Sequence, residues 1–189
     1  MKKFVLIALM IAMLLAVPAL AEDAAAPAEE GTTVTAVQMD WNQDVINAFV
    51  AAGFDGSMAT VTLKDGLAFQ ILLPDGFQQR DLTEEEAETC VVLALANEET
   101  GTNIRVMDSV KEDAGSLPEI ARNLLTQDPN TAIQFAVING TPALISGLQA
   151  EDSIIVSFDL GESRFVQIDF APLSGNNVLA QFFLAAIQF

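Results

Sequence analysis

Apolar and polar residues alternate from Ser57 onward with the period of two that is typical of β-strands. Two such runs, at 57–63 and 67–73, lie on either side of the turn Lys64-Asp65-Gly66. Pro74-Asp75-Gly76 closes the second run, because proline removes a backbone donor and glycine permits the turn. The pattern predicts a β-hairpin.

Six further runs have the character of strands. They lie at Val91–Ala96, Ile104–Met107, Ala132–Ile138, Ala143–Gln149, Ile154–Asp159 and Phe165–Ala171. Only a few turn residues separate the last four runs from one another, so we expect them to be antiparallel neighbours, since a parallel crossover needs about a dozen residues. Val91–Ala96 and Ala132–Ile138 are almost wholly apolar, which predicts central strands covered on both faces. In the run Ile154–Asp159 the apolar residues alternate in part with polar ones, namely Ser153, Ser157 and Asp159, which predicts a partly solvated face there.

Helical spacing of apolar residues predicts helices before, between and after these strands. They are expected at 40–52, just after Thr83, from Ser116 to Asp128, and from about Asn176. Asp40, Thr83 and Ser116 are placed as N-caps, and Glu119 completes a capping box with Ser116. The fold class predicted is α+β: an antiparallel sheet of about seven to eight strands flanked by helices, an α/β/α sandwich.

The first residues have the pattern of a secretory signal peptide. A basic start at Lys2 and Lys3 precedes an apolar run, and Ala19-Leu20-Ala21 is a small-residue cleavage site. We expect residues 1–21 to be removed, an uncleaved membrane anchor being the alternative. Residues 22–36 form a disordered acidic, Ala- and Pro-rich leader, and 37–189 a single domain. The mature protein is then secreted or extracytoplasmic, with no stable membrane insertion.

The net charge of the chain limits the classes of molecule that it is expected to bind. The full sequence has a net charge of −18, and the mature chain has 6 − 26 = −20. Nucleic acid is not expected as a partner, because lysine and arginine are scarce. The charge favours solubility, although it also attracts basic partners or divalent cations. Cys90 is the only cysteine, so no intrachain disulfide forms, and its apolar run makes it an inert core residue.

Carboxylates are the main chemistry that the composition leaves. The chain has no histidine and no tyrosine, which removes imidazole catalysis and imidazole metal sites. Most acids lie in turns and at helix starts, but Asp169 lies inside an apolar strand, where Arg105 and Arg164 are candidates to pair with it. The oxygen-rich loop 97–103 has a central Gly101 but lacks the ligand spacing of a calcium loop. We assign no catalytic, cofactor-binding or metal-binding residue, and no cofactor.

Certain local phrases, in this order of elements, resemble the PsbP-like family of small α/β/α sandwich proteins. They are the segments Phe69–Phe77, Ile138–Ala143 and Ala186–Phe189, within a likeness that spans Ser57 to Phe189. The helix at 40–52 has no place in that family pattern. The resemblance implies a non-enzymatic binding or accessory role, with another protein or a cell-envelope component as the partner, and it transfers no partner-contacting residue.

The sequence is therefore consistent with two functions. The first is an exported, non-catalytic binding or accessory protein of PsbP-like type. The alternative is an extracellular carboxylate-dependent hydrolase of glycosidase type, because a pair among 26 acidic residues could perform that reaction.

Overall fold

Eight strands form one sheet in the computed structural model, which describes residues 36–110, 115–148, 152–161, 164–172 and 177–189. The order across the sheet is β1-β7-β8-β9-β10-β6-β5-β4. The strands are β1 (Val37–Met39), β4 (Gln78–Gln79), β5 (Val91–Asn97), β6 (Thr102–Val110), β7 (Ala132–Ile138), β8 (Thr141–Leu148), β9 (Ser153–Asp159) and β10 (Arg164–Ala171). All neighbours are antiparallel except β1 and β7, which are parallel. The predicted α+β class with a mostly antiparallel sheet is confirmed.

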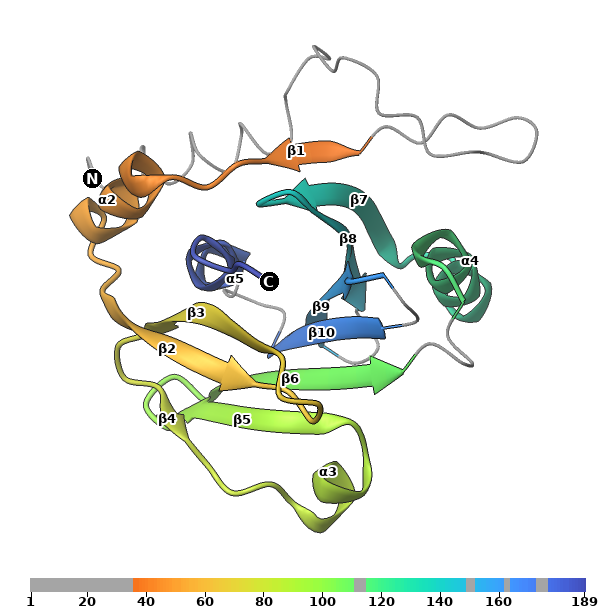
Figure 1. Cartoon of the computed structure of the whole chain (residues 1–189), viewed down its shortest axis with the longest axis horizontal. Coiled ribbons are helices and arrows are strands. Elements are labelled where there is room, and N and C mark those ends of the chain that lie inside the picture. The colour runs from red at the N-terminus through yellow and green to blue at the C-terminus, as the bar shows by residue number, and fades with distance from the viewer. Residues whose placement is uncertain (1–35, 111–114, 149–151, 162–163, 173–176) are drawn as a thin grey trace.

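The predicted hairpin forms, but it is not part of this sheet. Its strands, β2 (Gly56–Thr62) and β3 (Ala68–Pro74), make a separate two-stranded sheet (Figure 1). Places in the main sheet are taken instead by β1 and β4, which the sequence did not predict. These strands are three and two residues long, too short for an alternating pattern to reveal them.

Four helices are described: α2 (Gln43–Ala51), α3 (Glu84–Glu88), α4 (Leu117–Gln127) and α5 (Asn177–Leu184). The capping box predicted at Ser116 is present, and the N-cap predicted at Thr83 is confirmed and also forms a capping box, with Glu86. The N-cap predicted at Asp40 is wrong, because Asn42 is the residue whose side-chain oxygen accepts from Asp44 N–H at 3.0 Å. A cap must lie two or three residues before the amide that it satisfies, and Asp40 is too far from the first turn.

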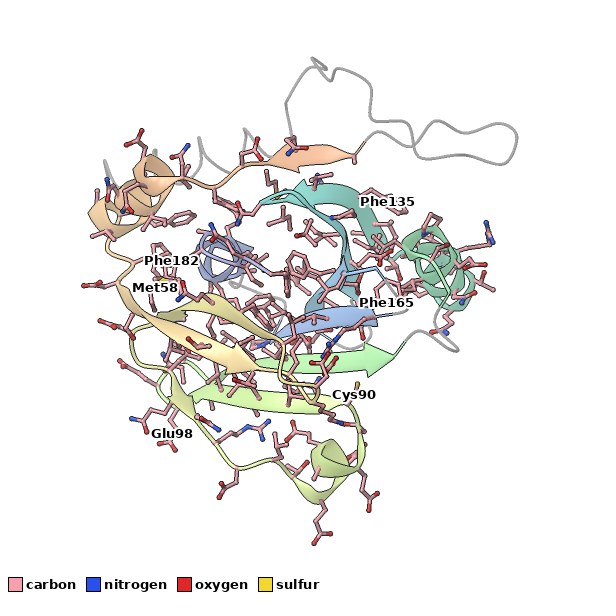
Figure 2. All side chains as sticks on the ribbon, viewed as in Figure 1. Met58, Cys90, Glu98, Phe135, Phe165 and Phe182 are labelled. Carbon is pink, nitrogen blue, oxygen red and sulfur yellow. The ribbon has the colours of Figure 1, made fainter. Side chains whose placement is uncertain are left out.

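The helices cover opposite faces of the sheet. On one face, here called the α4 face, Leu117 and Ala121 of α4 pack with Leu144 and Phe165. Figure 2 shows Phe135 and Phe165 beside α4. On the other, the α5 face, helix α5 and the β2–β3 hairpin share one core with the sheet. Its fully buried side chains include Phe158, Ile168 and Phe183. The layers are those of the predicted sandwich.

The strands covered on both faces are not the ones that the sequence indicated. β9 and β10 lie in the middle of the sheet and are the most buried, and Ser153 and Ser157 of β9 are each only 2% exposed. The predicted solvated face of β9 is therefore wrong. β5 and β7 each lie one strand from an edge, and Leu93 of β5 is only half-buried. An apolar run indicates that a strand is buried, but it does not indicate whether the strand lies at the centre of the sheet or near its edge.

Asn139, in the β7–β8 turn, ties three distant segments together. It adopts the left-handed conformation with φ 49°, which asparagine tolerates better than most residues. Its side-chain oxygen accepts from Trp41 N–H at 3.0 Å, and its Nδ2 donates to the carbonyl of Ile187 at 2.7 Å. The end of β1 and the segment after α5 are thereby fixed to one hairpin turn.

The expected signal peptide and nearly all of the expected leader lie outside the described residues. Within the described ranges, no helix has the length and apolar character needed to cross a membrane.

Candidate functional site

Asp169, the acid that the sequence analysis identified inside an apolar strand, forms an ion pair with a residue of the neighbouring strand. Asp169 of β10 is 2% exposed, and its Oδ2 accepts from Arg105 Nε of β6 at 2.9 Å and also from Arg105 Nη2. The two residues are direct partners in the β10–β6 register. The predicted pairing of Asp169 with Arg105 is confirmed. Because side chains alternate along a strand, this pair lies on the same face as Phe165, the α4 face.

Arg164, the other arginine proposed for Asp169, pairs elsewhere. Residues 164 and 169 belong to one strand, and an odd spacing of five places their side chains on opposite faces. Arg164 donates instead to Asp108 of β6, from Nε at 3.0 Å and from Nη2 at 2.8 Å. It also contacts the carboxylate of Asp65 in the turn of the β2–β3 hairpin. The alternation of β10 could have excluded the wrong pairing from sequence.

Asp108 also accepts a hydrogen bond from the turn of the β2–β3 hairpin. The backbone N–H of Lys64 donates to Asp108 Oδ2 at 3.1 Å, beside the bonds from Arg164. The hydrogen bonds from the two carboxylates, Asp108 first and Asp65 second, raise the pKa of Arg164, which stays charged at every ordinary pH. Arg164 in turn lowers the pKa of Asp65. The cluster clamps the hairpin turn onto the α5 face of the sheet.

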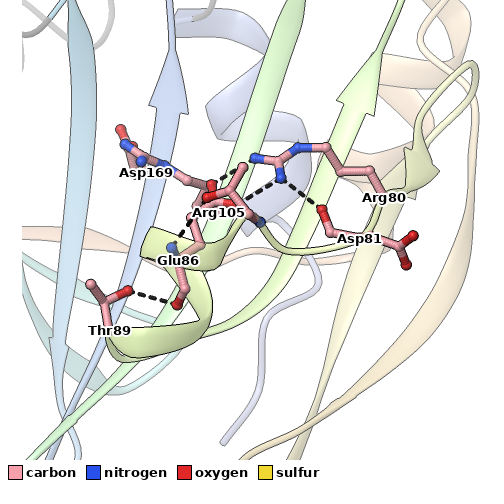
Figure 3. A network of polar contacts seen from close by, with 7 residues as sticks. Arg80, Asp81, Glu86, Thr89, Arg105 and Asp169 are labelled. Carbon is pink, nitrogen blue, oxygen red and sulfur yellow. Dashed lines mark hydrogen bonds and ion pairs between the residues drawn. The ribbon is translucent and has the colours of Figure 1, made fainter.

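The third buried acid, Glu86, is held by Arg80 and by its own helix start (Figure 3). Both of its oxygens accept from Arg80, each at 2.7 Å, and Oε2 also accepts from Thr83 N–H at 3.0 Å. The Arg80 hydrogen bonds lower the pKa of Glu86 to about 2, helped by the Thr83 amide and by the charge of Arg105. The sequence reasoning missed this pair. Its signal was the capping-box spacing of Thr83 and Glu86, which fixes where the carboxylate lies.

These three clusters contain all the buried acids of the described residues: Glu86, Asp108 and Asp169. Each is paired with an arginine. A guanidinium beside a carboxylate favours its charged form. Both oxygens of Glu86 and of Asp108 accept hydrogen bonds from their arginine, whereas Oδ1 of Asp169 is buried and has no hydrogen-bond partner among the described residues. These ion pairs have a structural role. They join the residue after β4 to α3, β6 to β10, and the β2–β3 hairpin to β10.

The loop weighed as a calcium site is a hairpin turn between β5 and β6. The side-chain oxygen of Asn97 accepts from the amides of Glu99 at 3.0 Å and Thr100 at 3.1 Å, and Gly101 supplies the positive φ of 70° that the turn needs. These bonds account for the polar residues of the loop. In the part of the chain that the structure describes, no group of three or more metal-ligating side chains comes together.

Cys90 also finds a structural place. It is partly buried at the start of β5, and its sulfur lies 3.5 Å from the hydroxyl of Ser109 on β6. The neighbouring strand thus accounts for its position.

A small polar groove of about 210 Å³ lies along β4. Gln78, Gln79 and Arg80 form one side of it, and Ala96, Asn97 and the acids Glu98 and Glu99 form the other. Figure 2 shows Glu98 at the outer side of this region. Charged side chains of both signs, Arg80, Glu98 and Glu99, line the groove.

Among solved structures, the chain is similar to cyanobacterial PsbP (CyanoP) from Synechocystis sp. PCC 6803. The sequence identity is 12% and the TM-score 0.44, over 70% of this chain and 92% of the cyanobacterial chain. No protein-family model and no curated protein matches the sequence. The resemblance to the PsbP-like family is confirmed as a likeness in fold, and it carries no ligand or activity over to this chain.

Proposed function

We propose that this protein is an exported binding or accessory protein, which acts without catalysis on another protein or on a component of the cell envelope. One observation carries the proposal: each buried carboxylate in the described residues is held by an arginine. The export part rests on the basic, apolar and small-residue order of residues 1–21.

The ion pairs weigh against the hydrolase alternative. Glycoside hydrolysis by two carboxyl groups needs one of them protonated near neutral pH, which requires a raised pKa. The pKa of Glu86 is instead lowered to about 2. Both oxygens of Asp108 accept hydrogen bonds from Arg164, and Oδ2 of Asp169 accepts two from Arg105. These bonds would have to be broken before those three oxygens could act on a substrate.

The proposal is tested by two assays on the mature protein. Sedimentation with envelope vesicles and with cell-wall material from the producing cells should show saturable binding that reaches a defined stoichiometry. Hydrolysis of a panel of glycosides and esters should be no faster than with heat-inactivated protein. Turnover that Glu86→Gln or Asp169→Asn abolishes, while circular dichroism shows that the variant is folded, would contradict the proposal and favour the hydrolase.

A further inference from the structure

The eight-stranded sheet has an open edge at β4. In the described residues, β4 pairs with β5 alone and is the last strand in the order. The N–H of Arg80 donates to the carbonyl of Ala94 at 3.0 Å, so this amide points inward. Successive residues of an antiparallel strand alternate in direction, and the N–H and C=O of Gln79 therefore point away from β5. They are available to another strand.

The groove lies beside this edge. Gln78, Gln79 and Arg80 line it, so a chain that paired with Gln79 would place its side chains next to the groove. Asn97 and Glu98, which follow Ala96, the cross-strand partner of Gln78, also line the groove. A peptide that adds a strand gains main-chain hydrogen bonds from the edge and gains its specificity from pockets of this kind.

The charge around the edge identifies the kind of partner. Between Asp75 and Glu99 the chain has eight acids and one arginine, a net charge of 1 − 8 = −7. Every one of these acids except Glu86 is exposed, and Arg80 is already paired with Glu86. A second copy of this chain would be repelled here, because it brings the same charge. A segment rich in lysine or arginine would be attracted.

We infer that the β4 edge and its groove are a docking site for a basic, extended segment of a partner protein, which adds a strand beside Gln79. The inference rests on the proposed binding function and names its surface and the chemistry of its partner. Arg80 directly follows β4, and its ion pair with Glu86 ties this end of the strand to α3. The position of the edge strand is therefore fixed before a partner binds.

The test uses two synthetic peptides of equal charge, one alternating lysine with valine and one alternating lysine with proline. Fluorescence anisotropy should show tighter binding of the lysine–valine peptide by tenfold or more, because proline cannot pair with an edge. The variant Glu98→Gln/Glu99→Gln should weaken that binding about fivefold to tenfold. The matched control Asp40→Asn/Asp44→Asn, which removes the same charge near α2, should change it less than about twofold. Hydrogen exchange should show the Gln79 amide becoming protected.

Each outcome bears on the inference. Equal binding of both peptides, equal weakening by both variant pairs, an unprotected Gln79 amide, or no binding of the lysine–valine peptide would each overturn it. In the envelope sedimentation assay, saturable binding that Glu98→Gln/Glu99→Gln leaves intact would show that the docking surface is wrong while the binding function stands. Substrate turnover is the result that would overturn the binding function itself.

Discussion

Arg105 on β6 and Asp169 on β10 are direct cross-strand partners, with Arg105 Nε 2.9 Å from Asp169 Oδ2 although 64 residues separate them in the chain. The carboxylate is almost fully buried, whereas the arginine side chain is 41% exposed. Water can therefore reach the cation but not the anion. The acid depends on this one arginine for its compensating charge.

Removing the arginine should be far more damaging than its partial exposure suggests. Arg105→Ala leaves the buried carboxyl group of Asp169 without its partner, and should lower the free energy of unfolding by about 2–4 kcal/mol. Arg122→Ala, on the exposed side of α4, is the control and should change it by less than about 0.5 kcal/mol. Urea unfolding of both variants measures the difference. Equal stability of the two variants would show that Asp169 does not rely on Arg105.

Arg164 should hold the β2–β3 hairpin to the sheet. Arg164→Ala leaves the buried Asp108 with only the Lys64 amide among these bonds, and should cost about 2–4 kcal/mol. Asp65→Asn removes an exposed partner of the same arginine and should cost much less than Arg164→Ala, because solvent screens an exposed pair. Hydrogen exchange in Arg164→Ala should accelerate first in β2 and β3. A uniform acceleration across the sheet would contradict a local clamp.

The two leucines of β5 should differ in their cost, because only one is in the core. Leu95 is 3% exposed and packs in the main cluster, so Leu95→Ala should cost about 2–5 kcal/mol. Leu93 is half-buried, and Leu93→Ala should cost about 1–2 kcal/mol, because less of its surface leaves water. Thermal or urea unfolding of the pair measures this. The two side chains lie on the same face of β5, so a larger loss for Leu93→Ala would mean that Leu93 is the more deeply buried of the two.

Local patterns predicted the elements well, because their signals lie within a few residues. The hairpin β2–β3, the N-cap at Thr83, the capping box at Ser116 and the strand β7 were all predicted from such signals. The assembly of the elements was harder to predict. The separation of β2–β3 from the main sheet depends on the clamp at Arg164 and on packing against α5, which no local pattern reports.

The candidate site was predicted in part. Asp169 and its partner Arg105 were identified, because a lone acid in an apolar strand needs a cation. The groove along β4 was not, because a strand of two residues has no pattern of its own. The pairing of Glu86 with Arg80 could have been predicted from the Thr83 capping box, which places the carboxylate at the helix start, six residues from the arginine.

The buried acids are structural groups paired with arginines, and the ionisation of Glu86 tests this most directly. Its pKa of about 2 lies below the ordinary 4.5, so the stability it adds is fully present above pH about 4.5 and is lost as the pH falls toward about 2. Unfolding of wild type and Glu86→Gln should differ by about 1–2 kcal/mol at neutral pH, with the difference vanishing near pH 2.

The decisive measurement is a pH titration of the Glu86 carboxyl carbon by ¹³C NMR in the folded protein. We expect a midpoint near pH 2, because the two Arg80 hydrogen bonds and the Thr83 amide stabilise the charged carboxylate. A midpoint of about 6 or higher would contradict it, because a carboxyl group that keeps its proton near neutral pH is what an acid catalyst requires.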